Sequence, residues 1–495
     1  MSMEAPAGEA QRGGASVPDG FDVAAFMEGL GFTSFHRRIL ALSCLVTFFD
    51  GLDFALVAFS LPFIRDAMAL DEAMLGTIST ATFAGQMIGS LLGAYLADMF
   101  GRRSVVIWCT ATAALLTFVT GLAETPAMLI MLRLAGGMAI GGLLAPIWSL
   151  NIESMPRAMR ATSVTIIMLG FSAGGAAAGQ VTNLLAPANG AYAALAVGSG
   201  GLLPAPGWHA VCLCCGVLTG GLALVLLAVL PESIRWLVAR RRPAEHITAL
   251  LCRFQPGFQV GPSALFQLSD ERCAGDNDAV FARMRELFRG WLVWITPLIW
   301  LGYFCSSFAI YLKTSFGVLF LEQLGLRVEQ AINLSSVGAL GGAVLGVALL
   351  LCTKRRGPGW IAMAPLLAIP CLLLIGSGAV VGGSLFVPLI LAASVLVGAG
   401  HAAVIAITSI YYPSAMRATG GGWASFMAKF AAVAAPLVGA RAFLGSTANV
   451  LDGYLFTALC LAGIVGSVLA LACFAKRLGE ESAGFAPVIL AGSPA

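Results

Sequence analysis

Residues 155–162 read MPRAMRAT, and residues 412–419 read YPSAMRAT. Both copies carry a proline that is followed, after one residue, by the sequence AMRAT. Each copy stands between two long apolar runs, the fourth and fifth of its half of the chain. The same polar connection at the same place in both halves predicts an internal repeat of two parallel units with six helices each.

The composition predicts that these helices lie in a membrane. Hydrophobic residues make up 59% of the 495 residues, and charged residues only 11%. Soluble domains carry about 25% charged residues, so this chain lacks the charges that would cover a surface in water. We therefore expect the lipid bilayer as its partner. A basic stripe with interleaved aromatic residues does not occur, which speaks against a nucleic-acid partner.

A membrane-spanning helix needs about 20 apolar residues. The sequence predicts twelve such helices, near residues 39–64, 74–97, 104–122, 126–148, 160–183, 208–230, 291–319, 330–352, 359–379, 384–411, 419–441 and 452–475. The predicted fold class is an all-α integral membrane protein with two pseudo-symmetric six-helix bundles. The predicted domains are a disordered N-terminal tail (1–38), a first bundle (39–231), a central loop (232–290), a second bundle (291–477) and a C-terminal tail (478–495).

The basic residues predict which loops face the cytoplasm, because short cytoplasmic loops are rich in Lys and Arg. One set of loops and flanking segments carries Arg37-Arg38, Arg102-Arg103, Arg157, Arg160, Lys354-Arg355-Arg356, Arg417 and Lys476-Arg477. The opposite loops carry only Arg65, Arg327 and Arg441. With an even number of helices, both tails and the central loop then lie in the cytoplasm, and the first helix is an uncleaved insertion signal. We expect a multi-pass protein of a bacterial inner membrane.

The loop after the second predicted helix carries a motif. Residues 93–103 read GAYLADMFGRR, which resembles the loop signature of the major facilitator superfamily. Arg133 and the glycines at 137, 141 and 142 resemble the fourth-helix pattern of the same family. The resemblance implies a twelve-helix carrier in which the loop takes part in gating. Its predicted gating residues are Gly93, Asp98, Gly101, Arg102 and Arg103.

Two further elements narrow the resemblance. Residues 49–53 read FDGLD, which is similar to the DGxD first-helix signature of the aromatic acid/proton symporters. Residues 412–423 carry the second element, a PxxxRATG sequence followed by Trp423. The resemblance implies secondary active import of a benzoate-like or hydroxybenzoate-like acid by proton symport through alternating access.

The chain departs from that family at three places. Cys352-Thr353-Lys354 stands where the family has an Asp in the eighth-to-ninth loop, and Lys429 stands where the family has an Arg. The interval 184–207 between the fifth and sixth predicted helices is unusually long. A Lys is a point charge, whereas an Arg binds a carboxylate with two parallel hydrogen bonds. We therefore expect a divergent member with its own substrate geometry.

Asp50 and Asp53 are the candidate proton-coupling residues. They lie three residues apart and thus on one face of a helix. Two carboxylates in a low dielectric do not ionise together at low cost, so one of them is suited to carry a proton. A pair at a helix end, exposed in a vestibule, is the alternative.

An aromatic carboxylate needs a cation and a flat apolar slot. Lys429 is the first candidate cation, and a structural pairing with a buried acid is its alternative. Arg133 and Lys313 are further candidates, although each could instead extend its charge to a membrane surface. His401 lies within a predicted helix, where it could line the cavity or bond a neighbouring backbone group. The candidate aromatic walls, each of which could also be plain core, are Phe54, Trp148, Tyr303, Phe304 and Phe426.

The repeated loop supplies further candidate gating residues. Glu153 stands just before its first copy and is expected to pair with Arg157 or Arg160, either as a gate latch or as a simple surface ion pair. The second copy contributes Arg417.

The energy source and the competing functions follow from motifs that the sequence lacks. A GxxxxGK[ST] phosphate-binding loop does not occur, so we expect transport to be driven by a gradient. We also expect no cofactor and no metal, and a functional monomer. A proton-coupled exporter of drugs or metabolites is the alternative. Exporters of the superfamily often carry a GxxxGPxxGG pattern in the fifth helix, whereas residues 170–176 read GFSAGGA. The absence of that proline favours import. An enzyme or a sensor is disfavoured, because the sequence shows no metal-ligand cluster and no nucleophile with a base.

Overall fold

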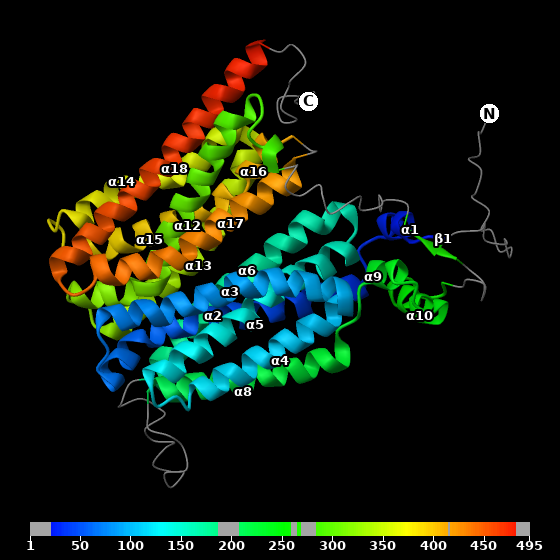
Figure 1. Cartoon of the computed structure of the whole chain (residues 1–495), viewed down its shortest axis with the longest axis horizontal. Helices are drawn as coiled ribbons and strands as arrows, with labels where there is room; N and C mark the ends of the chain where they lie inside the picture. Colours follow the sequence, from blue (N-terminus) through cyan, green and yellow to red (C-terminus); the bar gives the residue numbers. More distant parts are fainter. Residues whose placement is uncertain (1–20, 187–206, 259–264, 269–283, 414–415, 482–495) are drawn as a thin grey trace, which may run out of the picture.

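The structure of the chain is a computed structural model that describes residues 21–186, 207–258, 265–268, 284–413 and 416–481. Helices dominate it (Figure 1). The first half contains α2 (Ser34–Met68), α3 (Glu72–Phe100), α4 (Arg102–Thr120), α5 (Pro126–Ser154), η1 (Arg157–Met159), α6 (Arg160–Leu185) and α8 (Trp208–Val229). The second half contains α12 (Leu292–Gln323), α13 (Val328–Arg356), η2 (Pro358–Ala362), α14 (Met363–Gly376), α15 (Phe386–Val404), α16 (Ile407–Tyr411), α17 (Arg417–Phe443) and α18 (Thr447–Glu481).

Among the described helices, eleven are long and apolar enough to cross a membrane. The predicted all-α membrane fold is confirmed, while the predicted count of twelve is one more than this test returns. The helix outside the set is α3, which has 29 residues but carries several Ser, Thr and Gly residues and Gln86. These polar and small residues lower its mean hydropathy, and its glycines let other helices pack closely against it.

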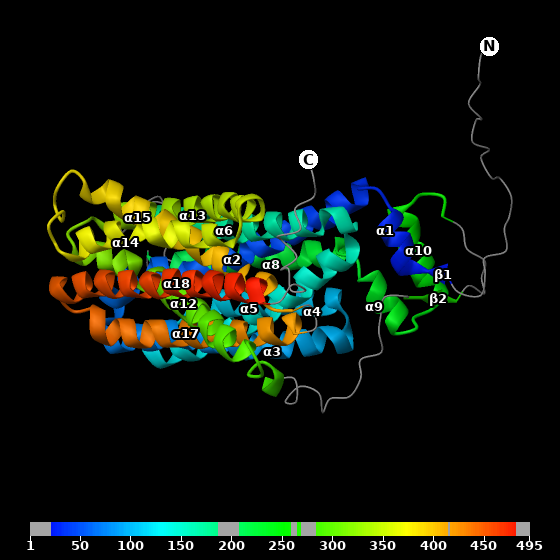
Figure 2. The same ribbon diagram turned by 90° about the horizontal axis from the view of Figure 1, so that it is seen from above.

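Helices pack mainly within their own half, and the two halves meet chiefly along two pairs of helices, with a smaller contact between α2 and α12. The cross-half pairs are α3 against α17 and α6 against α13, which lie side by side in two views (Figures 1 and 2). From this contact the two groups of helices diverge toward the end that carries α9 and α10 (Figure 1). We call that end the basic end, because α3, α5 and α8 finish there beside Arg102, Arg103, Arg157 and Arg160. The other end is called the closed end.

The tightest packing lies between α3 and α5. A Cβ atom added at Gly85, Gly89 or Gly93 would collide with the backbone of α5 at Leu134, Met138 or Gly142. The three glycines are spaced by four residues, so they form one smooth stripe along α3 that lets the two backbones approach closely. The close approach explains why a glycine stands at position 93 of the motif.

A small folded unit at the basic end corrects the prediction of disorder over residues 1–38. Residues 21–38 contain the strand β1 (Phe21–Asp22), the helix α1 (Val23–Gly29) and the first turn of α2. In the central segment, α9 (Ile234–Ala239), α10 (Ala244–Phe254) and the strand β2 (Phe266–Gln267) pack against them, and β1 pairs with β2 in parallel. Their shared apolar core includes Val23, Met27, Phe35, Ile234 and Leu251. Apolar residues at helical spacing in these short segments form this core. The segments are polar on average, so their composition alone suggests disorder. Residues 1–20 of the predicted tail and residues 187–206 of the long interval lie outside the described residues.

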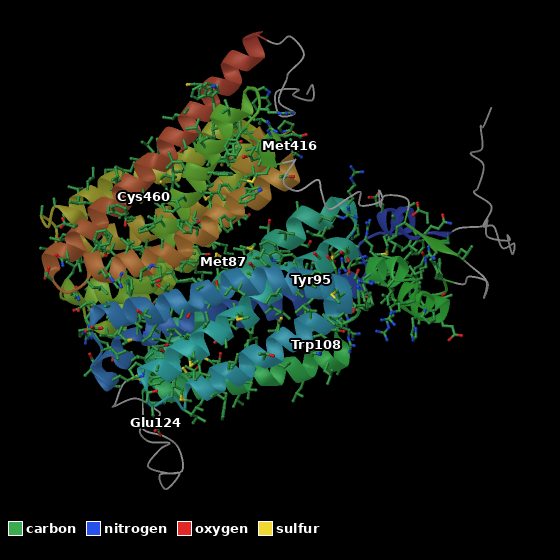
Figure 3. All side chains as sticks on the ribbon, viewed as in Figure 1. Met87, Tyr95, Trp108, Glu124, Met416 and Cys460 are labelled. Carbon is green, nitrogen blue, oxygen red and sulfur yellow. The ribbon has the colours of Figure 1, made fainter. Side chains whose placement is uncertain are left out.

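The outer surface of the helices is apolar. Exposed side chains such as Tyr95 on α3 and Trp108 on α4 lie on it (Figure 3). An apolar surface of this extent suits lipid rather than water as the surrounding medium.

Candidate functional site

Asp50 and Asp53 lie in the middle of α2 and are buried, with 4% of each residue exposed. This excludes the alternative of a pair exposed at a helix end. Asp53 accepts a hydrogen bond of 2.6 Å from the Thr117 hydroxyl on α4. Both carboxylate oxygens of Asp50 are buried without a hydrogen-bond partner. The two acids of one motif therefore have different surroundings, because Asp53 accepts a hydrogen bond from another helix and Asp50 accepts none.

Arg133 on α5 accompanies Asp53 inside the first half. It is only 1% exposed, its Nη2 donates to the Thr120 hydroxyl at 2.5 Å, and its charge acts on Asp53. The alternative that Arg133 extends to a membrane surface is therefore wrong. No ion pair within 4 Å joins them among the described residues, so Arg133 offsets the charge of Asp53 through the field inside the first half.

Lys429 approaches Asp50 from the second half of the chain. It lies on α17, and each charge acts electrostatically on the other. The ion pairs within 4 Å that involve described residues do not include either of them. The charges of Asp50 and Lys429 thus belong to different halves and interact without a direct ion pair, near the middle of their helices.

A group of aromatic rings also bridges the two halves, and we call it the central aromatic cluster. It consists of Phe54 on α2, Phe83 on α3 and Phe171 on α6 from the first half, and Tyr311 on α12 from the second half. The ring centroid of Phe54 lies 5.8 Å from that of Phe83 and 5.4 Å from that of Phe171. Tyr311 stands edge-on against Phe83 at 5.0 Å and against Phe54 at 6.3 Å. Phe54 is one helical turn beyond Asp50, so the rings and the charges adjoin each other.

The close approach of α2 and α6 explains where the cluster forms. A Cβ atom at Gly51 would collide with the carbonyl of Phe171. The glycine between the two acids of the FDGLD motif thus lets α6 come close enough for Phe171 to reach Phe54. Phe83, Phe171 and Tyr311 were not among the predicted wall residues, because a single aromatic residue in an apolar run carries no local signal of function.

His401 and Lys313 occupy different parts of the second half. His401 on α15 bonds through its Nδ1 to the Ser306 hydroxyl at 2.9 Å, and its ring lies 6.3 Å from that of Tyr311. Lys313 donates from its Nζ to the Ser394 carbonyl at 3.0 Å and lines a mostly apolar cavity of about 50 Å³ within the second half. Lys313 is buried there and does not extend to a membrane surface.

The structure places the other predicted wall residues away from the central aromatic cluster. Trp148 packs in the core of the first half, and the Tyr303 hydroxyl donates to the Ile405 carbonyl at 2.9 Å. Phe304 contacts Phe308 and Phe430, while Phe426 is 46% exposed on α17. Of the five predicted wall residues, only Phe54 belongs to the cluster.

At the basic end, Glu153 makes other contacts than predicted. Its carboxylate accepts from Arg102 at 3.3 Å and from the Ser233 hydroxyl, and Arg102 also pairs with Asp98 at 3.1 Å. The predicted pairing with Arg157 or Arg160 is wrong. Arg160 donates instead to the Met155 carbonyl and lies 3.9 Å from Glu28 of α1, and Arg157 is exposed on η1.

Two other motif residues complete this end. Arg103 donates to the carbonyls of Leu227 and Leu230, each at 2.7 Å, and so ties α4 to the end of α8. Arg417 is exposed at the start of α17, whose preceding residues 414–415 lie outside the described residues.

Glu232, which was not predicted as a site residue, lies beneath the motif loop. Its carboxylate accepts from the backbone N–H groups of Arg103 and Ser233 at 3.0 and 2.8 Å. Burial raises the pKa of the Glu232 carboxyl above its ordinary value, although these hydrogen bonds oppose the rise. Gly101 packs against this carboxylate with a φ of 99°. A side chain at position 101 would be strained and would also displace Glu232, which explains the glycine of the motif.

The closed end carries an ion pair between the halves that was not predicted. Arg65 at the end of α2 donates to both carboxylate oxygens of Glu322 at the end of α12, at 2.8 and 3.1 Å. Asn333 of α13 accepts from Gln180 and Asn183 of α6. These polar contacts join the halves at the end away from α9 and α10.

Comparison with known proteins decides the family. The family described as Major Facilitator Superfamily matches residues 43–436. The chain belongs to the Major Facilitator Superfamily. It is therefore a multi-pass membrane transporter and not an enzyme, and the resemblance to the aromatic acid branch of this superfamily is confirmed by the relatives described next.

Curated relatives cover most of the chain. A gallate transporter of Pseudomonas putida is 29% identical over 94% of this chain and 98% of its own length. The 4-hydroxybenzoate transporter PcaK of Pseudomonas aeruginosa is 30% identical over 85% of this chain and 89% of its own. Among solved structures, an inward-facing bacterial homologue of the human lysosomal transporter Spinster has a TM-score of 0.64 at 18% identity, over 94% of this chain and all of that one. The xylose transporter XylE of E. coli has a TM-score of 0.63 at 16% identity, over 89% and 99%. These two likenesses support the major facilitator fold.

Proposed function

We propose that this member of the superfamily imports a single-ring aromatic carboxylate together with protons, by alternating access. The relatives described as gallate and 4-hydroxybenzoate transporters support the substrate class. The observation that carries the proposal is a buried Asp50 without a hydrogen-bond partner in one half, whose charge interacts with that of Lys429 in the other half, beside a cluster of aromatic rings.

Lys429 binds the carboxylate of the substrate in this scheme. Buried cations in membrane-spanning helices are costly and generally serve a function. The substrate ring points toward the central aromatic cluster, where apolar and ring–ring contacts replace water. A Lys makes a single ionic contact, so the ring contributes strongly to the orientation of the substrate.

Asp50 couples the proton to the substrate. Without substrate, the negative charge of Asp50 offsets the positive charge of Lys429. When the substrate carboxylate binds to Lys429, two anions face one cation in a low dielectric, and Asp50 binds a proton to remove the excess charge. Proton and substrate are thus loaded together and released together. Asp53 has no part in this step, because its hydrogen-bond donor Thr117 and the nearby charge of Arg133 both belong to its own half.

The arrangement of the halves supports an inward-facing state. The basic end faces the cytoplasm if the positive-inside rule holds for the loops at that end, which places both termini in the cytoplasm. The halves touch at the closed end through Arg65 and Glu322 and diverge at the basic end (Figure 1). We propose that residues 39–231 and 291–477 rock against each other. The network of Asp98, Arg102 and Glu153 would rearrange when the basic end closes, and we expect its neighbours Arg157, Arg160 and Arg417 to take part.

Because a single chain supplies both faces of the site, we expect the monomer to be the functional unit. The relatives are bacterial proteins, which supports a location in the inner membrane. His401 would serve as a polar wall of the site through its contact with Ser306.

Uptake by proteoliposomes tests the proposal. Radiolabelled 4-hydroxybenzoate should accumulate when the outside is acidic, and a protonophore should abolish the accumulation. Accumulation that a protonophore increases would indicate export instead, and the absence of flux for every aromatic acid would refute the proposed function.

Replacing Lys429 tests the assigned carboxylate site. Lys429→Met should lower the affinity for the acid at least tenfold while the protein still folds, because it removes a half-buried cation that lacks a direct ion pair. Lys429→Arg should retain part of the affinity. Lys313→Met is a suitable control, since Lys313 lies in a separate cavity of the second half. An unchanged affinity in Lys429→Met, measured by inhibition of uptake, would contradict the assignment.

A further inference from the structure

Tyr311 is the member of the central aromatic cluster that comes from the second half. Its ring packs edge-on against two rings of the first half, Phe83 at 5.0 Å and Phe54 at 6.3 Å. Phe54, Phe83 and Phe171 contribute rings from three different helices. Together these three phenylalanines form a seat for one aromatic ring, and we call it the phenylalanine seat. In the present state of the protein, the phenol ring of Tyr311 rests against it.

The position of the seat makes its occupation by Tyr311 depend on whether the closed end is open or closed. The contacts at the closed end, Arg65 with Glu322 and Gly76 with Ala440, join α2 to α12 and α3 to α17. Opening that end separates α12 from α2 and α3. Tyr311 is carried by α12, whereas Phe54 and Phe83 are carried by α2 and α3, so the same motion withdraws Tyr311 from the seat.

We propose that the phenylalanine seat is the subsite for the aromatic ring of the substrate, and that Tyr311 and the substrate ring occupy it in turn. In the outward-open state, the seat receives the ring of a benzoate or hydroxybenzoate. When the closed end forms again, the phenol of Tyr311 takes the seat and the substrate leaves toward the basic end. This inference rests on the proposed function and names the part of the site that selects the ring.

The chemistry of the seat defines its ligand class. Edge-to-face and tilted ring pairs depend on the positive edge and negative face of aromatic rings, which a saturated ring lacks. Loss of one such contact corresponds to roughly a two- to tenfold change in affinity. Because Tyr311 places a single phenol ring there, the seat suits an acid with one ring. A substrate whose ring is saturated keeps its carboxylate contact with Lys429 but gains little from the seat.

The test compares two acids that share a carboxylate, 4-hydroxybenzoate and 4-hydroxycyclohexanecarboxylate. The ring preference is the ratio of their affinities, measured by inhibition of uptake from the side of the closed end. Phe83→Leu and Phe54→Leu should each reduce this ratio by roughly three- to tenfold, mainly through weaker binding of the aromatic acid. Phe456→Leu is the matched control, because its ring contacts Phe308 and Phe443 within the second half only. The ring preference of Phe456→Leu should equal that of the wild type.

A second variant tests the alternation itself. Tyr311→Leu vacates the seat in the inward-facing state, so binding of the aromatic acid from the side of the basic end should become several-fold tighter, while binding of the saturated acid should not change. Inside-out vesicles give this measurement.

The outcomes separate the two proposals. If Phe83→Leu weakens both acids equally, or if Tyr311→Leu weakens the aromatic acid, the seat is not the ring subsite and Tyr311 does not alternate with the substrate. The proposed function stands in that case, because wild-type uptake remains. A wild-type protein that binds neither acid overturns the proposed function and, with it, this assignment.

Discussion

Identical residues of one motif have different roles when their surroundings differ. Asp50 and Asp53 are one helical turn apart, yet only Asp53 has a hydroxyl donor and a compensating arginine in its own half. Asp50 has its counter-charge in the other half. The carboxylate that depends on the relative position of the halves is the one that can couple proton binding to conformational change.

Substitution of the two acids should therefore have different effects. Asp53→Asn leaves the charge of the buried Arg133 without its nearby counter-charge, so the melting temperature of this variant in detergent should fall clearly. Asp50→Asn should melt near the wild-type temperature but lose proton-driven accumulation. Its exchange of labelled for unlabelled acid should persist, since Lys429 remains. Wild-type accumulation by Asp50→Asn would contradict the coupling role.

At the residue scale, the sequence located the ionisable groups better than the aromatic ones. Charges within apolar runs are rare and conspicuous, so their positions, together with the family resemblance, single out Asp50, Asp53, Arg133 and Lys429. Aromatic residues are common in membrane-spanning helices, and of the central aromatic cluster only Phe54 was predicted as a wall residue. Which rings meet is decided by helices that are distant in the sequence.

At the scale of elements, glycine spacing determines how closely helices approach. The stripe of Gly85, Gly89 and Gly93 on α3 rests on the backbone of α5. This packing holds Phe83 of α3 at the interface with the second half, because it sets the position of the whole helix.

A side chain in the stripe should separate the two helices. Gly89→Val should destabilise the protein by about 1–3 kcal/mol, the usual cost of overpacking, and should lower its melting temperature in detergent. Gly221→Ala on α8 is the control, since nothing lies within 4 Å of a Cβ atom at that position. Equal melting temperatures for the two variants would show that the close approach is not required.

Polar segments between helices were the least predictable elements. The predicted disordered tail proved to fold from residue 21 onward, because short amphipathic pieces of the N-terminus and the central loop share one core. Glu153 was expected to pair within its own loop, but α9 brings Ser233 and the motif loop brings Arg102 to it instead. Sequence spacing suggests ion pairs between residues that are close in the chain. In the fold, the partners of Glu153 come from other elements.

At the scale of the whole molecule, the proposed alternating access would make the contacts at the closed end set the balance between the inward-facing and outward-open states. Arg65 and Glu322 form a bidentate pair between the halves and are each about a quarter exposed. Partly exposed ion pairs contribute about 1 kcal/mol or less. A change of this size alters a two-state equilibrium up to about fivefold.

Removing the pair should therefore shift the carrier toward the outward-open state. In Glu322→Gln, a cysteine placed by Ala440→Cys should react up to about fivefold faster with a membrane-impermeant thiol reagent, because Ala440 is buried against Gly76 when this end is closed. Asp66→Asn is the control, since Asp66 is largely exposed and contacts Arg65 without crossing to the second half. Exchanging the charges in Arg65→Glu with Glu322→Arg should restore the slow rate; a rate that stays fast would assign the effect to another contact.

The sequence by itself determined the membrane location, the two-half architecture, the family and the acids of the first helix. Composition, apolar run length, the repeated AMRAT loop and the FDGLD motif are local properties, and each persists in any arrangement of the helices. Only the tertiary structure decided that the charges of Lys429 and Asp50 interact, that Tyr311 rests against the phenylalanine seat, and that Arg65 closes one end with Glu322. These interactions join residues that are hundreds of positions apart, and they depend on how the two bundles meet, which local patterns along the sequence do not reveal.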